Sequence, residues 1–208
     1  AYAKILLERA AQPAGPEGKL TTQEALKRIA EAEHNSVDLL GKLLQFSQNP
    51  KEKFKRTNVH AVIEDALRLT GPMCKMSDVK ITKEFLADVP VVMADKDQFQ
   101  EVFVVLILNA IDAMPCKGEI TIKTVYSQTG DFIIISVKDT GVGIKREHLE
   151  RLSEPFFTTK ASGKSLGLGL TIAYEIITRH RGKIDVQSTI GEGATFTLTI
   201  PCAGSEEE

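Results

Sequence analysis

Residues 97–114 read DQFQEVFVVLILNAIDAM, in which apolar side chains fill most positions before Asn109 and Asp112. The run predicts a helix, and a helix this apolar belongs to a protein core. Amides and carboxylates are costly to bury without partners. The two polar residues should therefore face a polar cleft or a ligand, although they would also fit the ordinary amphipathic end of a helix.

The segments around this helix alternate between strand-like and helical patterns. Shorter helices are predicted at 59–69 and 170–180, and Gly182 is expected to cap the second. This order predicts an α+β fold, a two-layer α/β sandwich with its helices on one face of a mixed, largely antiparallel sheet. The predicted strands are 79–86, 91–93, 119–127, 131–139, 183–189 and 194–201.

The first 50 residues have a pattern of their own. Apolar residues recur at helical spacing from Thr21 to Gln48, a shorter helical piece ends near Ala11, and a Pro- and Gly-rich stretch separates the two. This predicts an antiparallel hairpin that forms a four-helix bundle when two copies dimerise. We assign 1–50 to the hairpin, 51–203 to the α/β domain and 204–208 to an acidic tail.

Composition excludes several classes of function. A formal net charge of −2 over 208 residues gives no general attraction to nucleic acid or to anionic lipid. No apolar run approaches the roughly 18 residues that cross a bilayer, so we expect a cytoplasmic chain without membrane contact, whether or not a longer parent carries spans upstream. Cys74, Cys116 and Cys202 are odd in number and far apart, which indicates reduced thiols.

The sequence DTGVGI at 139–144 follows a predicted strand. Glycines let a backbone approach a flat ring closely, and the Asp139 carboxylate can accept a hydrogen bond from an exocyclic amine. Adenine fits this pattern, with Gly141, Gly143 and Ile144 beside it. Alternatively, Asp139 merely caps the loop.

A second glycine motif, SLGLGL at 165–170, opens the last helix. Backbone N–H groups at a helix start suit a phosphate, and Gly167, Leu168, Gly169 and Leu170 would supply them. Many helices begin with glycine and bind nothing, and the spacing fits neither the Walker nor the dinucleotide pattern.

Residues 145–164 separate the two glycine motifs and are charged and irregular. A segment this long inside a compact domain suggests a lid. We expect Phe156 and Phe157 to anchor the lid by packing. Lys160 would reach a terminal phosphate, or else it is an ordinary solvated lysine.

In this order, NAIDAM, DTGVGI, EPFFTTK, GLGL and GEGATFTLTIP resemble the boxes of the catalytic domain of sensor histidine kinases of the nitrogen-regulator type. The resemblance covers about 51–201. It implies the GHKL (Bergerat-type) ATP-binding sandwich that these kinases share with DNA gyrase and related ATPases. It also implies a protein-histidine kinase that passes the γ-phosphoryl of ATP to a histidine and then to an aspartate of a response-regulator receiver domain.

The resemblance assigns roles to individual residues. Asn109 looks like the Mg²⁺ ligand, Asp139 like the acceptor of the adenine amine, and Thr195 like the hydroxyl that reaches adenine through water. Phosphate oxygens and water would complete the octahedral shell of Mg²⁺. The expected nucleotide-binding set is Asn109, Asp112, Asp139, Gly141, Gly143, Ile144, Lys160, Gly167, Leu168, Gly169, Leu170 and Thr195.

The hairpin resembles the dimerisation and phosphoacceptor domain of the same kinases, which implies a homodimer through these helices. The acceptor histidine would then lie upstream of Ala1. His34 falls on the second helix and lacks the acceptor motif. We expect it to be solvated, and we expect His60, His148 and His180 to be surface residues.

Three residues depart from the family pattern, and the departure at Val105 matters most. Val105 stands where the family has a second polar residue, four positions before Asn109, and Ser165-Leu166 replace a Gly-Thr pair. Val105 leaves open a non-catalytic ATP-binding module that regulates partner contacts. An ATPase of the gyrase or chaperone branch is disfavoured, because its activating carboxylate would stand at this same position.

Overall fold

The computed structural model describes residues 53–160 and 166–204. The chain divides into two units, Ala1–Lys51 and Glu52–Glu208, and the second contains all of the described residues. The predicted helical hairpin, His34, Ser165 and residues 205–208 lie outside the described part.

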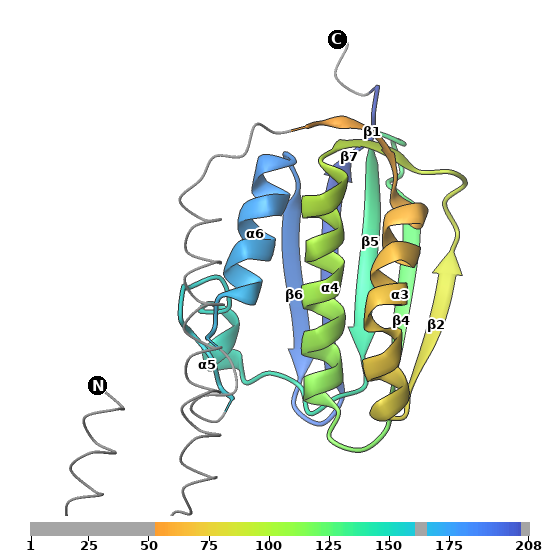
Figure 1. Cartoon of the computed structure of the whole chain (residues 1–208). Helices are drawn as coiled ribbons and strands as arrows, with labels where there is room; N and C mark the ends of the chain where they lie inside the picture. The colour runs from red at the N-terminus through yellow and green to blue at the C-terminus, as the bar shows by residue number, and fades with distance from the viewer. Residues whose placement is uncertain (1–52, 161–165, 205–208) are drawn as a thin grey trace, which may run out of the picture. The chain divides into compact units, whose positions relative to one another are not determined.

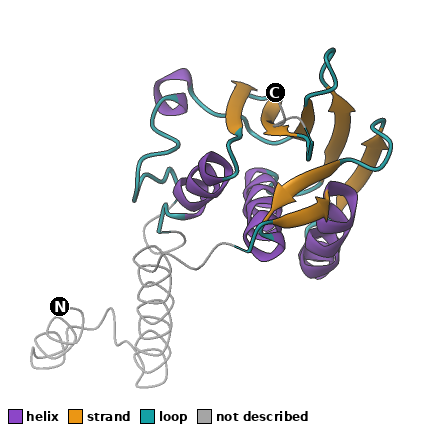
Figure 2. Cartoon of the chain, turned by 90° about the horizontal axis from the view of Figure 1, so that it is seen from above, coloured by secondary structure: helices purple, strands orange, loops and turns teal. Residues whose placement is uncertain are grey.

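Five strands form the main sheet in the order β2-β4-β5-β7-β6, with β2 and β4 parallel and the other neighbours antiparallel. Three helices lie side by side on one face of this sheet (Figure 1). The view from above shows the two layers (Figure 2). The predicted two-layer α/β sandwich is therefore confirmed. The strands are β2 (Val79–Phe85), β4 (Gly118–Tyr126), β5 (Phe132–Asp139), β7 (Gly193–Pro201) and β6 (Lys183–Thr189), and the helices are α3 (Val59–Met76), α4 (Lys96–Ala113) and α6 (Gly169–Arg179).

A small second sheet connects the first described strand of this unit, through its partner strand, to the end of the last strand. Its strands are β1 (Lys55–Asn58) and β3 (Val91–Ala94), which pair antiparallel. A bridge between Val92 and Cys202 links β3 to the end of β7.

The core lies between the helices and the main sheet. In β5 alternate residues are buried, namely Ile133, Ile135 and Val137, and Asp139 is the next residue in the same phase. Because side chains alternate along a strand, the Asp139 carboxylate lies on the helix-covered face. The buried residues of α4 are Phe99, Val102, Phe103, Leu106, Ile107, Ala110 and Ile111.

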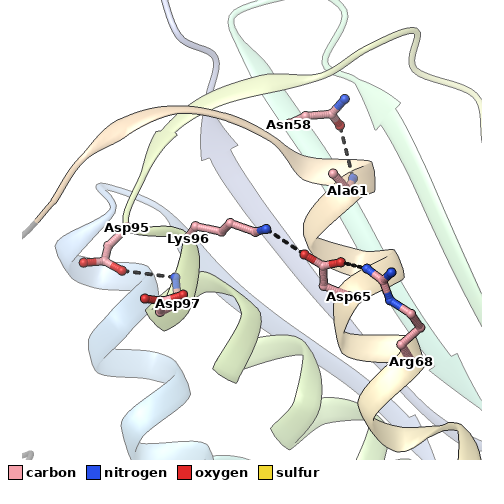
Figure 3. Close-up of polar contacts among 7 residues, drawn as sticks. All are labelled: Asn58, Ala61, Asp65, Arg68, Asp95, Lys96 and Asp97. Atoms are coloured by element: carbon pink, nitrogen blue, oxygen red, sulfur yellow. Dashed lines mark hydrogen bonds and ion pairs between the residues drawn. The ribbon is translucent and has the colours of Figure 1, made fainter.

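Polar caps fix where α3 and α4 begin (Figure 3). The Asn58 side chain accepts hydrogen bonds from the backbone N–H groups of His60 and Ala61, at 2.9 and 3.3 Å. Asp95 accepts in the same way from Asp97, at 3.1 Å. Such caps replace helical partners that the first N–H groups lack.

An ion-pair cluster joins the two helix starts. Lys96 Nζ of α4 lies 2.7 Å from Asp65 Oδ2 of α3, and the Arg68 guanidinium contacts the other oxygen of Asp65 (Figure 3). Pairs this exposed stabilise a fold by only about 0–1 kcal/mol each. The far end of α4 carries Asn109 and Asp112.

Helix α3 runs to Met76, past the predicted end at Leu69 and through Pro72. Proline removes one helical hydrogen bond, the one to the carbonyl four residues earlier. That residue is Arg68, on the exposed side of the helix, where water can take the place of the missing donor.

The cap of α6 differs from the prediction. Arg181, with a φ of 54°, takes the left-handed conformation, and Gly182 does not. Gly182 is needed for space instead, because a Cβ there would lie 2.8 Å from the backbone carbonyl oxygen of Thr199.

The three histidines that were expected at the surface are all at least partly buried, and His148 is half-buried. His180 is 4% exposed, and its Nε2 accepts a hydrogen bond from the backbone N–H of Asp95 at 3.1 Å. His60 is half-buried and stacks on Phe85. The sequence gives no sign of either contact, because both partners are distant along the chain.

The three cysteines are free thiols, as expected, with Cys74 buried, Cys202 half-buried and Cys116 exposed. Within 53–160 and 166–204, no helix combines the length and the apolar character needed to span a bilayer.

Candidate nucleotide site

A cavity of about 240 Å³ lies where α4 and β5 end, at the edge of the sheet that is lowest in Figure 1. The segment after β5, the start of α6 and the start of β7 complete its walls. Most of the residues predicted from the sequence line this cavity. They are Asn109, Asp112, Asp139, Gly143, Ile144, Lys160, Gly167, Gly169 and Leu170.

Asp139 is the buried acid of the cavity, with an exposed fraction of 4%. Its Oδ1 accepts hydrogen bonds from the backbone N–H of Gly141 at 2.8 Å and of Ala194 at 3.2 Å. Burial raises the pKa of this carboxyl above its ordinary value of 3.8, and the two hydrogen bonds only partly offset that rise. Both bonds use Oδ1, so Oδ2 is available to accept a proton from the amine of a ligand.

The turn after Asp139 is packed too tightly for side chains. A Cβ on Gly141 would lie 2.7 Å from the carbonyl oxygen of Ala113, at the end of α4. Gly143 has a φ of +73°, and a Cβ there would lie 2.1 Å from the carbonyl oxygen of Thr189. The Val142 N–H also donates to the Ala113 carbonyl at 3.0 Å. Gly141 is therefore needed for the contact with α4, and Gly143 for the contact with the end of β6.

At the end of α4, Asn109 and Asp112 face the cavity and contact Lys160. Lys160 Nζ lies 2.5 Å from Asp112 Oδ2 and 3.2 Å from Asn109 Oδ1. Amide and carboxylate oxygens are hard donors of the kind that Mg²⁺ prefers, and the lysine shows that a positive charge fits between them. Asn109 Oδ1 therefore fits a magnesium ion whose other ligands come from phosphate and water, with the Asp112 carboxylate beside it. Among the described residues, no cluster of three or more His, Cys, Asp and Glu forms a site from protein ligands alone.

The start of α6 forms the opposite wall. Gly167 has a φ of +68°, and a Cβ there would lie 2.5 Å from the Phe157 carbonyl oxygen. Leu168, the N-cap residue of α6, has no polar side chain to accept from the first N–H groups. These groups, together with the helix dipole, suit a phosphate.

The segment after β5 contains a short helix, α5 (Arg146–Leu149). Phe157 lines the cavity, and the Arg151 guanidinium lies 4.3 Å from the centre of its ring. Phe156, by contrast, is 60% exposed with a φ of 66°, so only one of the two predicted packing anchors packs. His148 also lines the cavity and was not predicted to do so.

Comparison with known proteins agrees with this geometry. Residues 94–204, more than half of the chain, match the family described as histidine kinase-, DNA gyrase B- and HSP90-like ATPases. The chain belongs to this ATPase family.

The similar proteins within the family are histidine kinases. Sporulation kinase E of Bacillus subtilis (strain 168) is 35% identical over 155 residues, which are 74% of this chain and 21% of that protein. The solved catalytic domain of histidine kinase ThkA is 29% identical with a TM-score of 0.63, covering 72% of this chain and 95% of that one. The complex of ThkA with the response regulator TrrA gives a TM-score of 0.74 at 23% identity, covering 99% and 57%.

The chain spans less than half the length of the curated relatives that it matches. Its fold is the GHKL-type ATP-binding fold of histidine kinase catalytic domains.

Within this ATPase domain, three predicted residues do not line the cavity. Gly141 packs against Ala113 at the end of α4, and Leu168 is buried at the start of α6. In β7, Ala194 and Phe196 face the cavity, so Thr195 points to the opposite face of the sheet. The hydroxyl predicted to reach adenine through water is therefore on the wrong face.

The structure adds lining residues that motif reasoning missed. Strand phase would have indicated two of them, because Ala194 and Phe196 alternate in step with Leu198 and Ile200 of the core. Of the others, Ala113 ends α4 and His148 lies in the short helix α5, and the rest come from the irregular segment after β5. The added residues are Ala113, Val142, His148, Leu152, Phe157, Thr158, Thr159, Ala194 and Phe196.

Proposed function

We propose that the chain is the catalytic part of a sensor histidine kinase of the nitrogen-regulator type. It binds Mg²⁺-ATP in this cavity and transfers the γ-phosphoryl to a histidine, which passes it on to an aspartate of a response regulator. One observation carries the proposal: a buried carboxylate, Asp139, lies in a cavity that it shares with Asn109 and the glycine-rich start of α6.

Each part of the cavity has a role in this reaction. Asp139 Oδ2 accepts from the adenine amine, while the turn at Gly143 keeps the backbone close to the base. The N–H groups at Gly169 and Leu170 bind phosphate oxygens. Asn109 Oδ1 would hold Mg²⁺, which when bound neutralises charge on the phosphates. The protein's contribution is then positioning and electrostatic stabilisation, as in other phosphoryl transfers.

The proposal extends to residues outside the described part. The acceptor histidine lies upstream of Ala1, and the N-terminal helices form the homodimer that brings the histidine and the catalytic domain together. A response regulator is the expected partner, because ThkA, a protein of the same fold, has been solved in complex with one.

Nucleotide binding is tested first, by isothermal titration calorimetry of ATP with Asp139→Asn. An amide presents N–H groups where the adenine amine needs an acceptor. Loss of a hydrogen bond to a charged group corresponds to about 1.5–3 kcal/mol, or roughly a tenfold to hundredfold weaker affinity. Asp131→Asn, just before the start of β5, is the matched control. Unchanged ATP affinity in Asp139→Asn contradicts the assignment of the cavity.

Phosphoryl transfer is tested with a chain extended upstream, γ-labelled ATP and Mg²⁺. A kinase acquires label that is stable to base and labile to acid, as expected of a phosphohistidine. Tight ATP binding without any labelling supports the second candidate instead, a regulatory module that binds ATP without catalysis.

Val105 is the observation that favours this second candidate. Its side chain is half-buried, and a Cβ on Gly169 would lie 3.3 Å from Val105 Cγ1. An apolar group thus stands beside the proposed phosphate site, where a polar one would help to orient Mg²⁺ or the nucleophile. Under the kinase proposal, Val105→Asn increases the labelling rate and leaves ATP affinity unchanged.

A further inference from the structure

Lys160 connects the segment after β5 to the end of α4. Its Nζ bridges Asp112 Oδ2 at 2.5 Å and Asn109 Oδ1 at 3.2 Å, and the lysine is 48 residues from Asp112 along the chain. The lysine and the carboxylate are each partly exposed, at 32% and 52%. The contact therefore lies at the mouth of the cavity, within reach of solvent and of ions.

The two halves of this bridge differ in strength. Asp112 carries a full negative charge at the shorter distance, and charge-assisted hydrogen bonds are about twice as strong as neutral ones. Asn109 is neutral and accepts the longer bond. Asp112 therefore binds the ammonium group more strongly, and the ammonium group lies against Asn109 Oδ1.

Lys160 and Mg²⁺ need the same oxygen. An amide oxygen that ligates a metal directs a lone pair at it, and Lys160 already donates to that oxygen. Two cations at contact distance also repel each other. The oxygen has a second lone pair, so the repulsion between the two cations is what drives the ammonium group away when Mg²⁺ binds Asn109 Oδ1 directly.

We propose that Lys160 is a stand-in cation for Mg²⁺, held over Asn109 by Asp112, which is a positioning residue and not a metal ligand. This inference rests on the proposed function, because it concerns the same site. It predicts that Lys160 raises the concentration of Mg²⁺ needed for tight ATP binding. It also predicts that Asp112 affects this requirement only through Lys160.

The first test needs no nucleotide. The whole chain is treated briefly with an amine-acetylating ester, and the labelling rate of each lysine is measured by mass spectrometry. Asp112→Asn should increase acetylation of Lys160 several-fold. Lys145, an exposed lysine on the same segment with its own ion pair to Glu147, should keep its rate and serves as the internal control. An unchanged rate at Lys160 in Asp112→Asn overturns the proposal.

The second test is a double-mutant cycle on the Mg²⁺ requirement. ATP affinity is measured by calorimetry at a series of Mg²⁺ concentrations. The quantity compared is the Mg²⁺ concentration at which the gain in ATP affinity is half-maximal. Lys160→Gln should lower it several-fold, whereas Lys160→Arg, which keeps the cation, should not. Asp112→Asn should lower it in the natural chain and have no effect in the Lys160→Gln background.

Two outcomes of the cycle contradict the inference. If Asp112→Asn raises the Mg²⁺ requirement equally in both backgrounds, then Asp112 is a metal ligand. If Lys160→Gln leaves the requirement unchanged, the bridge is an ordinary surface ion pair. Failure of ATP to bind any variant would instead refute the proposed function, and the acetylation test would still decide whether Asp112 holds Lys160.

Discussion

Asp139 combines two properties that rarely coincide in one residue, deep burial and a free acceptor oxygen. Burial disfavours the charged form, so the pKa of the carboxyl is raised, and the hydrogen bonds from Gly141 and Ala194 only reduce the rise. The adenine amine donates its hydrogen bond best to the ionised carboxylate. The residue that we propose to bind the base is thus one whose pKa the fold has raised.

This shift predicts a pH dependence of ATP binding. As the pH falls through the raised pKa of Asp139, the carboxyl takes up a proton and ATP affinity falls, by about tenfold per pH unit below the pKa if binding needs the ionised form. The loss begins at a higher pH than an ordinary aspartate would give. Calorimetry across a pH series measures it. A profile in which affinity is constant down to the ordinary value of 3.8 would contradict the prediction.

The raised pKa of Asp139 affects stability in the opposite direction: rising pH strengthens ATP binding but lowers the free energy of unfolding. Between the ordinary value of 3.8 and the raised folded pKa, the folded chain holds the Asp139 proton and the unfolded chain has lost it. This residue therefore lowers the free energy of unfolding as the pH rises through that window. Urea unfolding of the natural chain and of Asp139→Asn isolates the effect. The difference in stability between them should grow in favour of the variant as the pH rises.

At the scale of elements, the cavity depends on how closely two turns approach. The loop after β5 is fixed between the end of α4 and the turn from β6 to β7, where Gly191 N–H donates to the Val142 carbonyl at 2.9 Å. Gly143 packs against the turn from β6 to β7, whereas Gly191 faces open space. Both have positive φ, at 73° and 83°, but only Gly143 has neighbours that a side chain would meet.

These glycines form a matched pair for mutation. Gly191→Ala meets only backbone strain and should cost about 1 kcal/mol in the free energy of unfolding. Gly143→Ala adds the contact with Thr189 and should cost a further ~1–3 kcal/mol, as other overpacked sites do. Denaturant unfolding measures both changes. Equal losses would show that space at Gly143 is not the constraint.

At the scale of the whole molecule, the described walls of the cavity belong to the second unit. The ends of α4 and β5 and the start of α6 all belong to Glu52–Glu208, which also contains the hydrophobic core between helices and sheet. The lining residues that the structure describes run from Asn109 to Phe196.

We therefore expect residues 52–208 alone to fold and to bind ATP. Calorimetric ATP affinity should match that of the whole chain within about threefold, that is within ~0.7 kcal/mol. Thermal unfolding should be a single cooperative transition that ATP shifts upward, because a ligand that binds only the folded state stabilises it. A much weaker affinity would mean that the N-terminal unit contributes to the site.

Local sequence was sufficient for much of this protein. The phase of apolar residues predicted most helices and strands to within a few positions, and the glycine motifs located the two loops of the cavity. Asn109, Asp139 and Gly143 were identifiable because each breaks a local pattern, a polar group in an apolar run or a glycine after a strand. Signals of this kind lie within a few residues of one another, so no folded structure is needed to detect them.

Other features depend on residues that meet only after folding. Sequence alone did not predict that β2 pairs in parallel with β4, that His180 is buried, or that Lys160 covers Asn109. Thr195 was predicted to reach adenine, but its side chain lies on the other face of β7. A motif gives the type of residue at a position, whereas strand pairing decides which face of the sheet its side chain lies on. Packing between distant segments fixes these features, since the free energy of each contact depends on a partner that chain order does not specify.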